Sequence, residues 1–150
     1  MKIDILKNKI VLYLKKEYTK CFDYNNIDEI ELYFKEIILK LNKLLKTRLY
    51  GFYTLNIFVD KYYGSVIEII DENEIYDLDE INLQINIINA DFLYETEVYN
   101  KNDNYEQYLC KNKIYLKLKN NPSKVDMLKL LEFSKIIYDT EDIIFCSKKI

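Results

Sequence analysis

Apolar and polar residues alternate along several short segments of the chain, and this period of two is typical of strands buried on one face. The segments are rich in Ile, Leu, Tyr and Val, which favour extended backbone. We predict strands over residues 3–6, 10–14, 52–60, 65–71, 81–87, 92–98, 113–119 and 143–146. The polar residues 99–106 are predicted to form a loop.

Two segments have a helical repeat instead, in which apolar residues recur every three or four positions. The longer one covers residues 27–48, with Ile30, Phe34 and Ile38 on its apolar stripe, and the shorter one covers residues 124–138. Each helix is preceded by a capping-box pattern, in which a polar side chain and an acidic residue three positions later bond the first turn. The two boxes are Asn26 with Glu29 and Ser123 with Asp126.

Because the strands occur mostly in pairs that suit hairpins, the element order favours an α+β fold. We predict a two-layer structure with a mainly antiparallel β-sheet and both helices packed on one face. No linker or low-complexity tract interrupts the chain, so residues 1–150 are expected to form a single domain.

The composition excludes several classes of enzyme. The chain has no His, two Gly and one Arg, so a histidine-dependent nucleophile, an imidazole metal ligand and a glycine-rich phosphate loop are all ruled out. We therefore predict a protein that is not an enzyme and needs no cofactor.

The three cysteines, Cys21, Cys110 and Cys146, form no C-x-x-C pair and are expected to be buried free thiols. The longest uncharged run covers residues 49–59, which is too short to cross a bilayer. These observations predict a protein that does not enter membranes and lies in the cytoplasm of a bacterium, or of its host if a phage encodes it.

The charge is strongly segregated along the sequence. Residues 1–70 carry a net charge of +3 and residues 107–150 carry +4, whereas residues 71–106 hold eleven carboxylates and one lysine, which gives −10. A single surface with so many like charges would repel itself unless a basic partner neutralised it.

We interpret this acidic segment as the docking surface for a protein partner that is rich in Lys and Arg, so the protein would be a regulator or adaptor. Tyr62 and Tyr63, at a predicted hairpin tip, would anchor the partner. The acidic residues predicted to bind it are Asp71, Glu72, Glu74, Asp77, Asp79, Glu80, Asp91, Glu95 and Glu97.

Three other readings of the acidic segment stay open. It can be a solvated surface that only keeps the protein in solution. It can belong to a phage-encoded inhibitor of host defence or nucleic-acid machinery, with carboxylates that imitate phosphates. It can also serve a carboxylate-dependent, metal-assisted enzyme, in which Asp71, Asn73, Asp77 and Asp79 would supply oxygen ligands.

Direct binding of nucleic acid is not expected, because a single arginine and a pI near 5.2 are unlike a basic binding stripe. Strand 81–87 alternates apolar residues with amides, and as an edge strand it could pair with a second copy to form a homodimer.

Residues 108–118 and the following helix with Leu130, Leu131, Glu132 and Phe133 resemble the C-terminal part of MecA-type adaptor proteins. That family carries a hairpin with a tyrosine-rich second strand and a closing helix that ends in a Leu-Ser-Glu-aromatic-Gly motif. The resemblance implies an α/β domain that binds an AAA+ unfoldase. This chain has Leu131 and Ser134 where the motif has Ser and Gly, and no functional residue is carried over.

Overall fold

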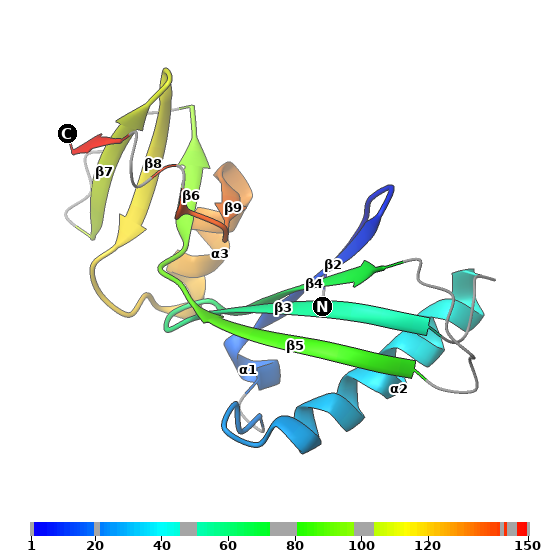
Figure 1. Ribbon diagram of the computed structural model, residues 1–150. Helices are drawn as coiled ribbons and strands as arrows, with labels where there is room; N and C mark the ends of the chain where they lie inside the picture. Colours follow the sequence, from blue (N-terminus) through cyan, green and yellow to red (C-terminus); the bar gives the residue numbers. More distant parts are fainter. Residues whose placement is uncertain are drawn as a thin grey trace. The chain divides into compact units, whose positions relative to one another are not determined.

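The computed structural model describes residues 2–19, 22–45, 51–72, 81–97, 104–141, 143 and 147–149. The chain divides into two compact units. Unit 1 consists of Met1–Phe58 and Gly64–Ile88, and unit 2 consists of Val59–Tyr63 and Asn89–Ile150. Each unit contains one five-stranded sheet (Figure 1), and the two units are described separately below.

The sheet of unit 1 has the strand order β1-β2-β4-β3-β5. Its strands are β1 (Lys2–Ile5), β2 (Lys9–Lys15), β3 (Gly51–Asp60), β4 (Gly64–Asp71) and β5 (Ile81–Asn89). β2 pairs antiparallel with β1 and β4, so that Leu12 lies opposite both Ile3 and Ile67. The predicted strands at 3–6, 10–14, 52–60, 65–71 and 81–87 are thereby confirmed, with small shifts at their ends.

Two helices belong to unit 1, α1 (Lys16–Thr19) and α2 (Ile27–Leu45). α2 begins where it was predicted, because the Glu29 N–H donates to Asn26 Oδ1 at 3.3 Å and satisfies a free donor of the first turn. Its apolar stripe packs on the sheet through Ile30, Phe34 and Ile38, which are buried. The predicted helix extended to residue 48, and residues 46–48 lie outside the described ranges.

The sheet of unit 2 has the order β10-β7-β8-β6-β9. Its strands are β6 (Leu93–Thr96), β7 (Tyr105–Cys110), β8 (Lys113–Leu118), β9 (Lys135–Ile137) and β10 (Lys148–Lys149). All its pairings are antiparallel. The predicted strands at 92–98 and 113–119 are confirmed in shortened form. Residues 144–146 of the predicted strand 143–146 lie outside the described residues, and the prediction is wrong at Ile143, which is helical.

The prediction of a loop over residues 99–106 is wrong at its end, because Tyr105 and Glu106 already belong to β7. The two-residue turn that follows explains the difference. Lys111 and Asn112 have φ values of 49° and 64°, the conformation of a tight hairpin turn whose twist matches the flanking strands. The turn fixes the register of β7 on β8 and places Tyr105 opposite Leu118.

α3 (Lys124–Phe133) is shorter than the predicted helix 124–138. It begins as expected, with the Asp126 N–H donating to Ser123 Oγ at 3.1 Å. It ends at Ser134, which has extended backbone, and the following residues pair with β6 as β9. Two consecutive isoleucines, Ile136 and Ile137, favour the strand, because β-branched side chains fit a pleated sheet better than a helix.

The predicted α+β class with mainly antiparallel strands is confirmed. The strands form two five-stranded sheets instead of the one that we expected, with α2 in unit 1 and α3 in unit 2. The single domain stays a prediction, which unfolding experiments can test. None of the helices in the described ranges has both the length and the apolar character needed to cross a membrane.

Candidate interaction surface

β3 lies inside the sheet of unit 1 and shows how a fully covered strand of this sheet is packed. Tyr53, Leu55 and Ile57 alternate along one face and are at most 4% exposed. The Asn42 side chain of α2 donates from Nδ2 to the Tyr53 hydroxyl at 3.0 Å, so this face is the one that α2 covers. Apolar burial against the helix therefore holds the centre of the unit together.

The opposite face of the same sheet carries a line of polar side chains across four strands. Lys9 Nζ on β2 lies 2.8 Å from Glu68 Oε2 on β4, and Asn56 Nδ2 on β3 donates to Glu68 Oε1 at 3.3 Å. Asn86 Nδ2 on β5 donates to Asn56 Oδ1 at 3.0 Å. Because each of these groups has a partner inside the sheet, the line joins the strands to one another.

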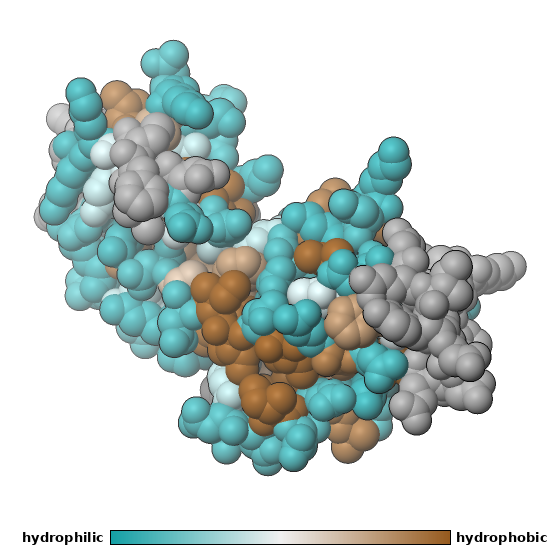
Figure 2. Space-filling model, in the orientation of Figure 1, coloured by the Kyte–Doolittle hydropathy of each residue, from teal (hydrophilic) through white to brown (hydrophobic). Residues whose placement is uncertain are grey.

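β5 is an edge strand, which no other strand in the described part of the chain covers on its outer side. Its inward-facing side chains are Leu83, Ile85 and Ile87, which are half-buried, unlike the fully buried residues at the equivalent positions of β3. Figure 2 shows apolar side chains gathered along β5 and the adjoining part of α2 on the face in view. Ile88, on the other face of the strand, is 39% exposed.

The amino-acid sequence of β5 lacks the features that usually protect an edge strand. Such strands are commonly short, or carry a charged residue or a proline that blocks pairing with another chain. β5 is nine residues long and contains no charged residue and no proline, and the uncharged run extends from Ile81 to Ala90. β1, at the other edge of the sheet, is four residues long and carries Lys2 and Asp4.

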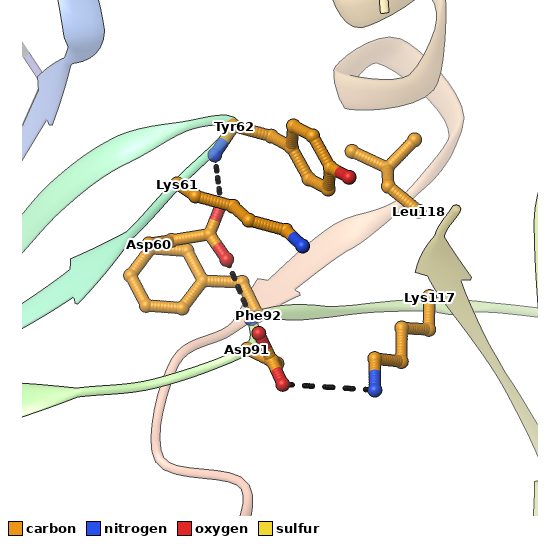
Figure 3. A pocket seen from close by; sticks show the side chains of 7 residues that line it. All are labelled: Asp60, Lys61, Tyr62, Asp91, Phe92, Lys117 and Leu118. Atoms are coloured by element: carbon orange, nitrogen blue, oxygen red, sulfur yellow. Dashed lines mark hydrogen bonds and ion pairs between the residues drawn. The ribbon is translucent and has the colours of Figure 1, made fainter. Parts of the chain in front are cut away.

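A small cavity of about 70 Å³ in unit 2 is lined by charged side chains (Figure 3). Asp60 is buried beside it and accepts three backbone hydrogen bonds, from Tyr62 N at 3.0 Å, Tyr63 N at 2.8 Å and Phe92 N at 3.0 Å. The carboxylate thereby fixes the turn after β3 and the chain before β6. The cavity has room for a few water molecules only, so we assign Asp60 a structural role.

The predicted acidic residues are divided between the two units. Asp71 and Glu72 lie at the end of β4 in unit 1, where the Thr54 hydroxyl donates to Glu72 Oε1. Asp91, Glu95 and Glu97 lie in unit 2. The remaining four, Glu74, Asp77, Asp79 and Glu80, lie outside the described residues, as does Asn73 of the predicted metal site.

Lysines of unit 2 partner several carboxylates of the acidic segment. Lys113 Nζ lies 3.0 Å from Glu95 Oε1, and Lys117 Nζ lies 3.6 Å from Asp91 Oδ2. The same carboxylate of Glu95 raises the pKa of Lys113 above its ordinary value. These ion pairs lower the negative charge that the segment presents to a partner.

Glu106, the last carboxylate of the segment, has its own partners. The Tyr108 hydroxyl donates to Glu106 Oε2 at 2.7 Å, and Lys149 Nζ lies 3.6 Å from Oε1. Tyr108, followed by Lys149 and Lys117, holds the pKa of this carboxyl below its ordinary value. Among the described residues, no group of three or more acidic or cysteine side chains is arranged to hold a metal ion.

The two predicted aromatic anchors contribute to the packing of unit 2. Tyr63 is 5% exposed, and its ring lies 6.0 Å from that of Phe92. Tyr62 is half-buried, and its hydroxyl donates to the carbonyl of Lys119 at 3.1 Å. Tyr63 therefore offers little surface to a partner, whereas Tyr62 stays partly exposed, and its role as an anchor stays a prediction.

Tyr94 lies at the centre of the unit 2 core, against Leu116, Leu118 and Leu130. Its hydroxyl is buried and has no hydrogen-bond partner within the described part of the chain. Burial, followed by the nearby Asp60 carboxylate, raises the pKa of this hydroxyl well above its ordinary value. The phenol is therefore held neutral.

Cys110 was expected to be a free thiol, and this is wrong, because it is disulfide-bonded. It is buried at the end of β7, in a cluster with Leu93 and Tyr115. The other cysteines, Cys21 and Cys146, lie outside the described residues. Disulfides persist mainly in oxidising compartments, and the cytoplasmic location stays a prediction.

Comparison with protein-family models, curated proteins and solved structures finds no match to this chain. The resemblance to MecA-type adaptors stays a prediction. Sequence reasoning had identified strand 81–87 as a possible edge strand, and its uncharged run was visible in the sequence. It had missed Asp60, because a lone aspartate before a predicted turn gives no sign of how many backbone groups it binds.

Proposed function

We propose that this protein is a non-enzymatic protein-interaction module that binds a partner by strand addition at the open edge of β5. The observation that carries the proposal is the combination of nine extended residues, no charge and incompletely covered apolar side chains at Leu83, Ile85 and Ile87. An added strand would receive main-chain hydrogen bonds from the edge and would cover these side chains.

A selection of random peptides displayed on phage against the immobilised protein tests this function. We expect enriched peptides that alternate apolar and polar residues, because a strand places every second side chain against α2. The matched control is Ile85→Pro, which removes one backbone donor at the middle of the edge. Enriched peptides that bind wild type and Ile85→Pro equally well, or no enrichment at all, would contradict strand addition.

Docking of a Lys/Arg-rich partner on the acidic residues stays a prediction, and the ion pairs at Glu95 and Asp91 weaken its basis. Salt separates it from strand addition. Contacts between exposed opposite charges weaken strongly in about 0.5 M NaCl, whereas main-chain pairing and apolar burial persist. The phage-encoded decoy and the metal-assisted enzyme also stay predictions.

A further inference from the structure

The orientation of the β5 backbone determines which of its groups point outward. The pairing of Asn56 with Asn86 and the 2.9 Å hydrogen bond from Ala90 N to the Val59 carbonyl show that β5 runs parallel to β3. Backbone groups of successive residues point to opposite sides of a strand, so the even-numbered residues face β3. The N–H and C=O groups on the open side belong to Ile81, Leu83, Ile85, Ile87 and Asn89.

Two copies of β5 that run in opposite directions place similar residue types opposite each other. Antiparallel pairing centred on Ile85 places Leu83 opposite Ile87 on the apolar face. On the polar face, the same register places Gln84 opposite Asn86, whose amides are complementary hydrogen-bonding groups. Ile85 then faces its own counterpart with outward N–H and C=O groups, which is the hydrogen-bonded type of antiparallel pair.

We propose that β5 pairs antiparallel with β5 of a second copy of this chain, with the twofold axis at Ile85, and this rests on the proposed strand addition. The result is a closed, isologous dimer with a continuous ten-stranded sheet. Because the axis is perpendicular to the sheet, both copies carry α2 on the same face.

Two properties favour a second copy over an unrelated strand. The first is charge. The segment from Ile81 to Ala90 contains no ionisable side chain, so two paired copies place no like charges opposite each other along the strand. The second is apolar coverage. Leu83, Ile85 and Ile87 are half-buried, and the matching residues of the second strand cover them in the register described above.

Sedimentation equilibrium of the purified chain tests the dimer directly. We expect a mass of twice 18.2 kDa at high protein concentration and dissociation on dilution. Hydrogen exchange should show protection of the Leu83, Ile85 and Ile87 amides in the dimer and its loss on dilution, because only the dimer bonds them. Ile85→Pro removes the central pair of hydrogen bonds and should raise the dimer Kd at least about tenfold, with a control for folding by circular dichroism.

Two double variants test the register without altering the apolar face. Gln84→Glu with Asn86→Glu places carboxylates opposite each other twice in the dimer and should weaken it. Gln84→Lys with Asn86→Glu places opposite charges there and should retain it. Both variants change the same exposed positions and lose the same hydrogen bond to Asn56, so each controls for folding of the other. We expect their dimer Kd values to differ about tenfold, because two cross-strand pairs are repulsive in one variant and attractive in the other.

A wild-type chain that is monomeric up to about 200 µM, or equal Kd values for the two double variants, would overturn the self-pairing. The peptide selection distinguishes this failure from failure of the proposed function. If the chain is monomeric but captures peptides at β5, strand addition stands and the occupant is another protein. If the chain captures no peptide and is monomeric, both proposals fall.

Discussion

The sheets of the two units differ in how their edges are protected. In unit 2 the edge strands β9 and β10 have three and two residues and carry lysines. In unit 1 the edge strand β1 is short and charged, whereas β5 is long and uncharged. Short or charged edges resist pairing with other chains. Three of these four edge strands therefore have a recognised form of protection, and β5 is the exception.

The units also differ in what stabilises them. Unit 1 depends on a long helix that buries Ile30, Phe34 and Ile38 against the sheet. α3 in unit 2 buries only Leu130 fully, and the unit adds the three backbone hydrogen bonds that the Asp60 carboxylate accepts. Unit 2 therefore relies more on specific polar contacts, so single substitutions of those groups should have the larger effects.

Replacement of the buried carboxylate in unit 2 is expected to have the largest effect. Asp60→Ala leaves three backbone donors without their acceptor and should lower the free energy of unfolding by about 3–5 kcal/mol. In unit 1, Glu68→Gln keeps an acceptor for Asn56 and loses the charge that faces Lys9, so it should cost about 1 kcal/mol. Urea denaturation followed by circular dichroism measures both. Equal losses of unfolding free energy would contradict the stronger dependence of unit 2 on specific polar contacts.

Reduction of the disulfide should have the next largest effect, a loss of about 2–4 kcal/mol, because the cross-link restricts the unfolded chain. Calorimetry with and without reductant measures it. The same scans test the single domain, because units that unfold separately give two transitions instead of one. Peptide mapping of the unreduced chain should recover Cys110 in a cross-linked peptide that separates on reduction.

Alkaline pH should destabilise the protein through buried tyrosines. Burial, followed by the nearby Asp4, raises the pKa of Tyr13 to about 12. The unfolded chain therefore loses this proton first, and the stability is fully present below about pH 10 and falls between about pH 10 and 12. Urea denaturation across this range checks the sign. Tyr13→Phe should reduce the fall, and an unchanged pH profile would contradict this assignment.

The same substitution, Tyr to Phe, should affect the free energy of unfolding differently in the two units. Tyr53→Phe removes the hydroxyl that accepts from Asn42 and should cost about 1–2 kcal/mol. Tyr94→Phe removes a buried hydroxyl that has no partner among the described residues and should be neutral or stabilise by about 1 kcal/mol. Thermal unfolding of both variants measures this. A loss on Tyr94→Phe would show that this hydroxyl has a bonding partner, such as an internal water.

The surface ion pairs of unit 2 should have the smallest effect. Lys113→Ala and Lys117→Ala should each change the free energy of unfolding by less than about 1 kcal/mol, because Lys113 is exposed, Lys117 is partly exposed and solvent screens both. Urea denaturation at low and high salt measures the change. A larger loss would mean that these pairs form a network that holds the sheet together.

Local patterns in the sequence predicted most of the elements. The helical repeat and the capping residues Asn26 and Ser123 placed the starts of α2 and α3, because capping is a contact between residues three positions apart. The alternation of apolar and polar residues over 81–87 predicted β5, because this pattern also involves residues that are close in the sequence. The end of α3 was missed, because the pairing of Ile136 and Ile137 with β6 competes with the helix and involves residues more than 40 positions away.

The order of residues along the chain establishes which are apolar, which are charged and where α2 and α3 begin. The folded chain is needed to show that the strands form two sheets, that β5 is at an edge and that lysines of β8 lie beside Glu95 and Asp91. It also joined Asp60 to the amide of Phe92, 32 positions away. The physical reason is that strand order and charge neutralisation depend on which distant segments meet, and periodicity along the chain carries no information about that.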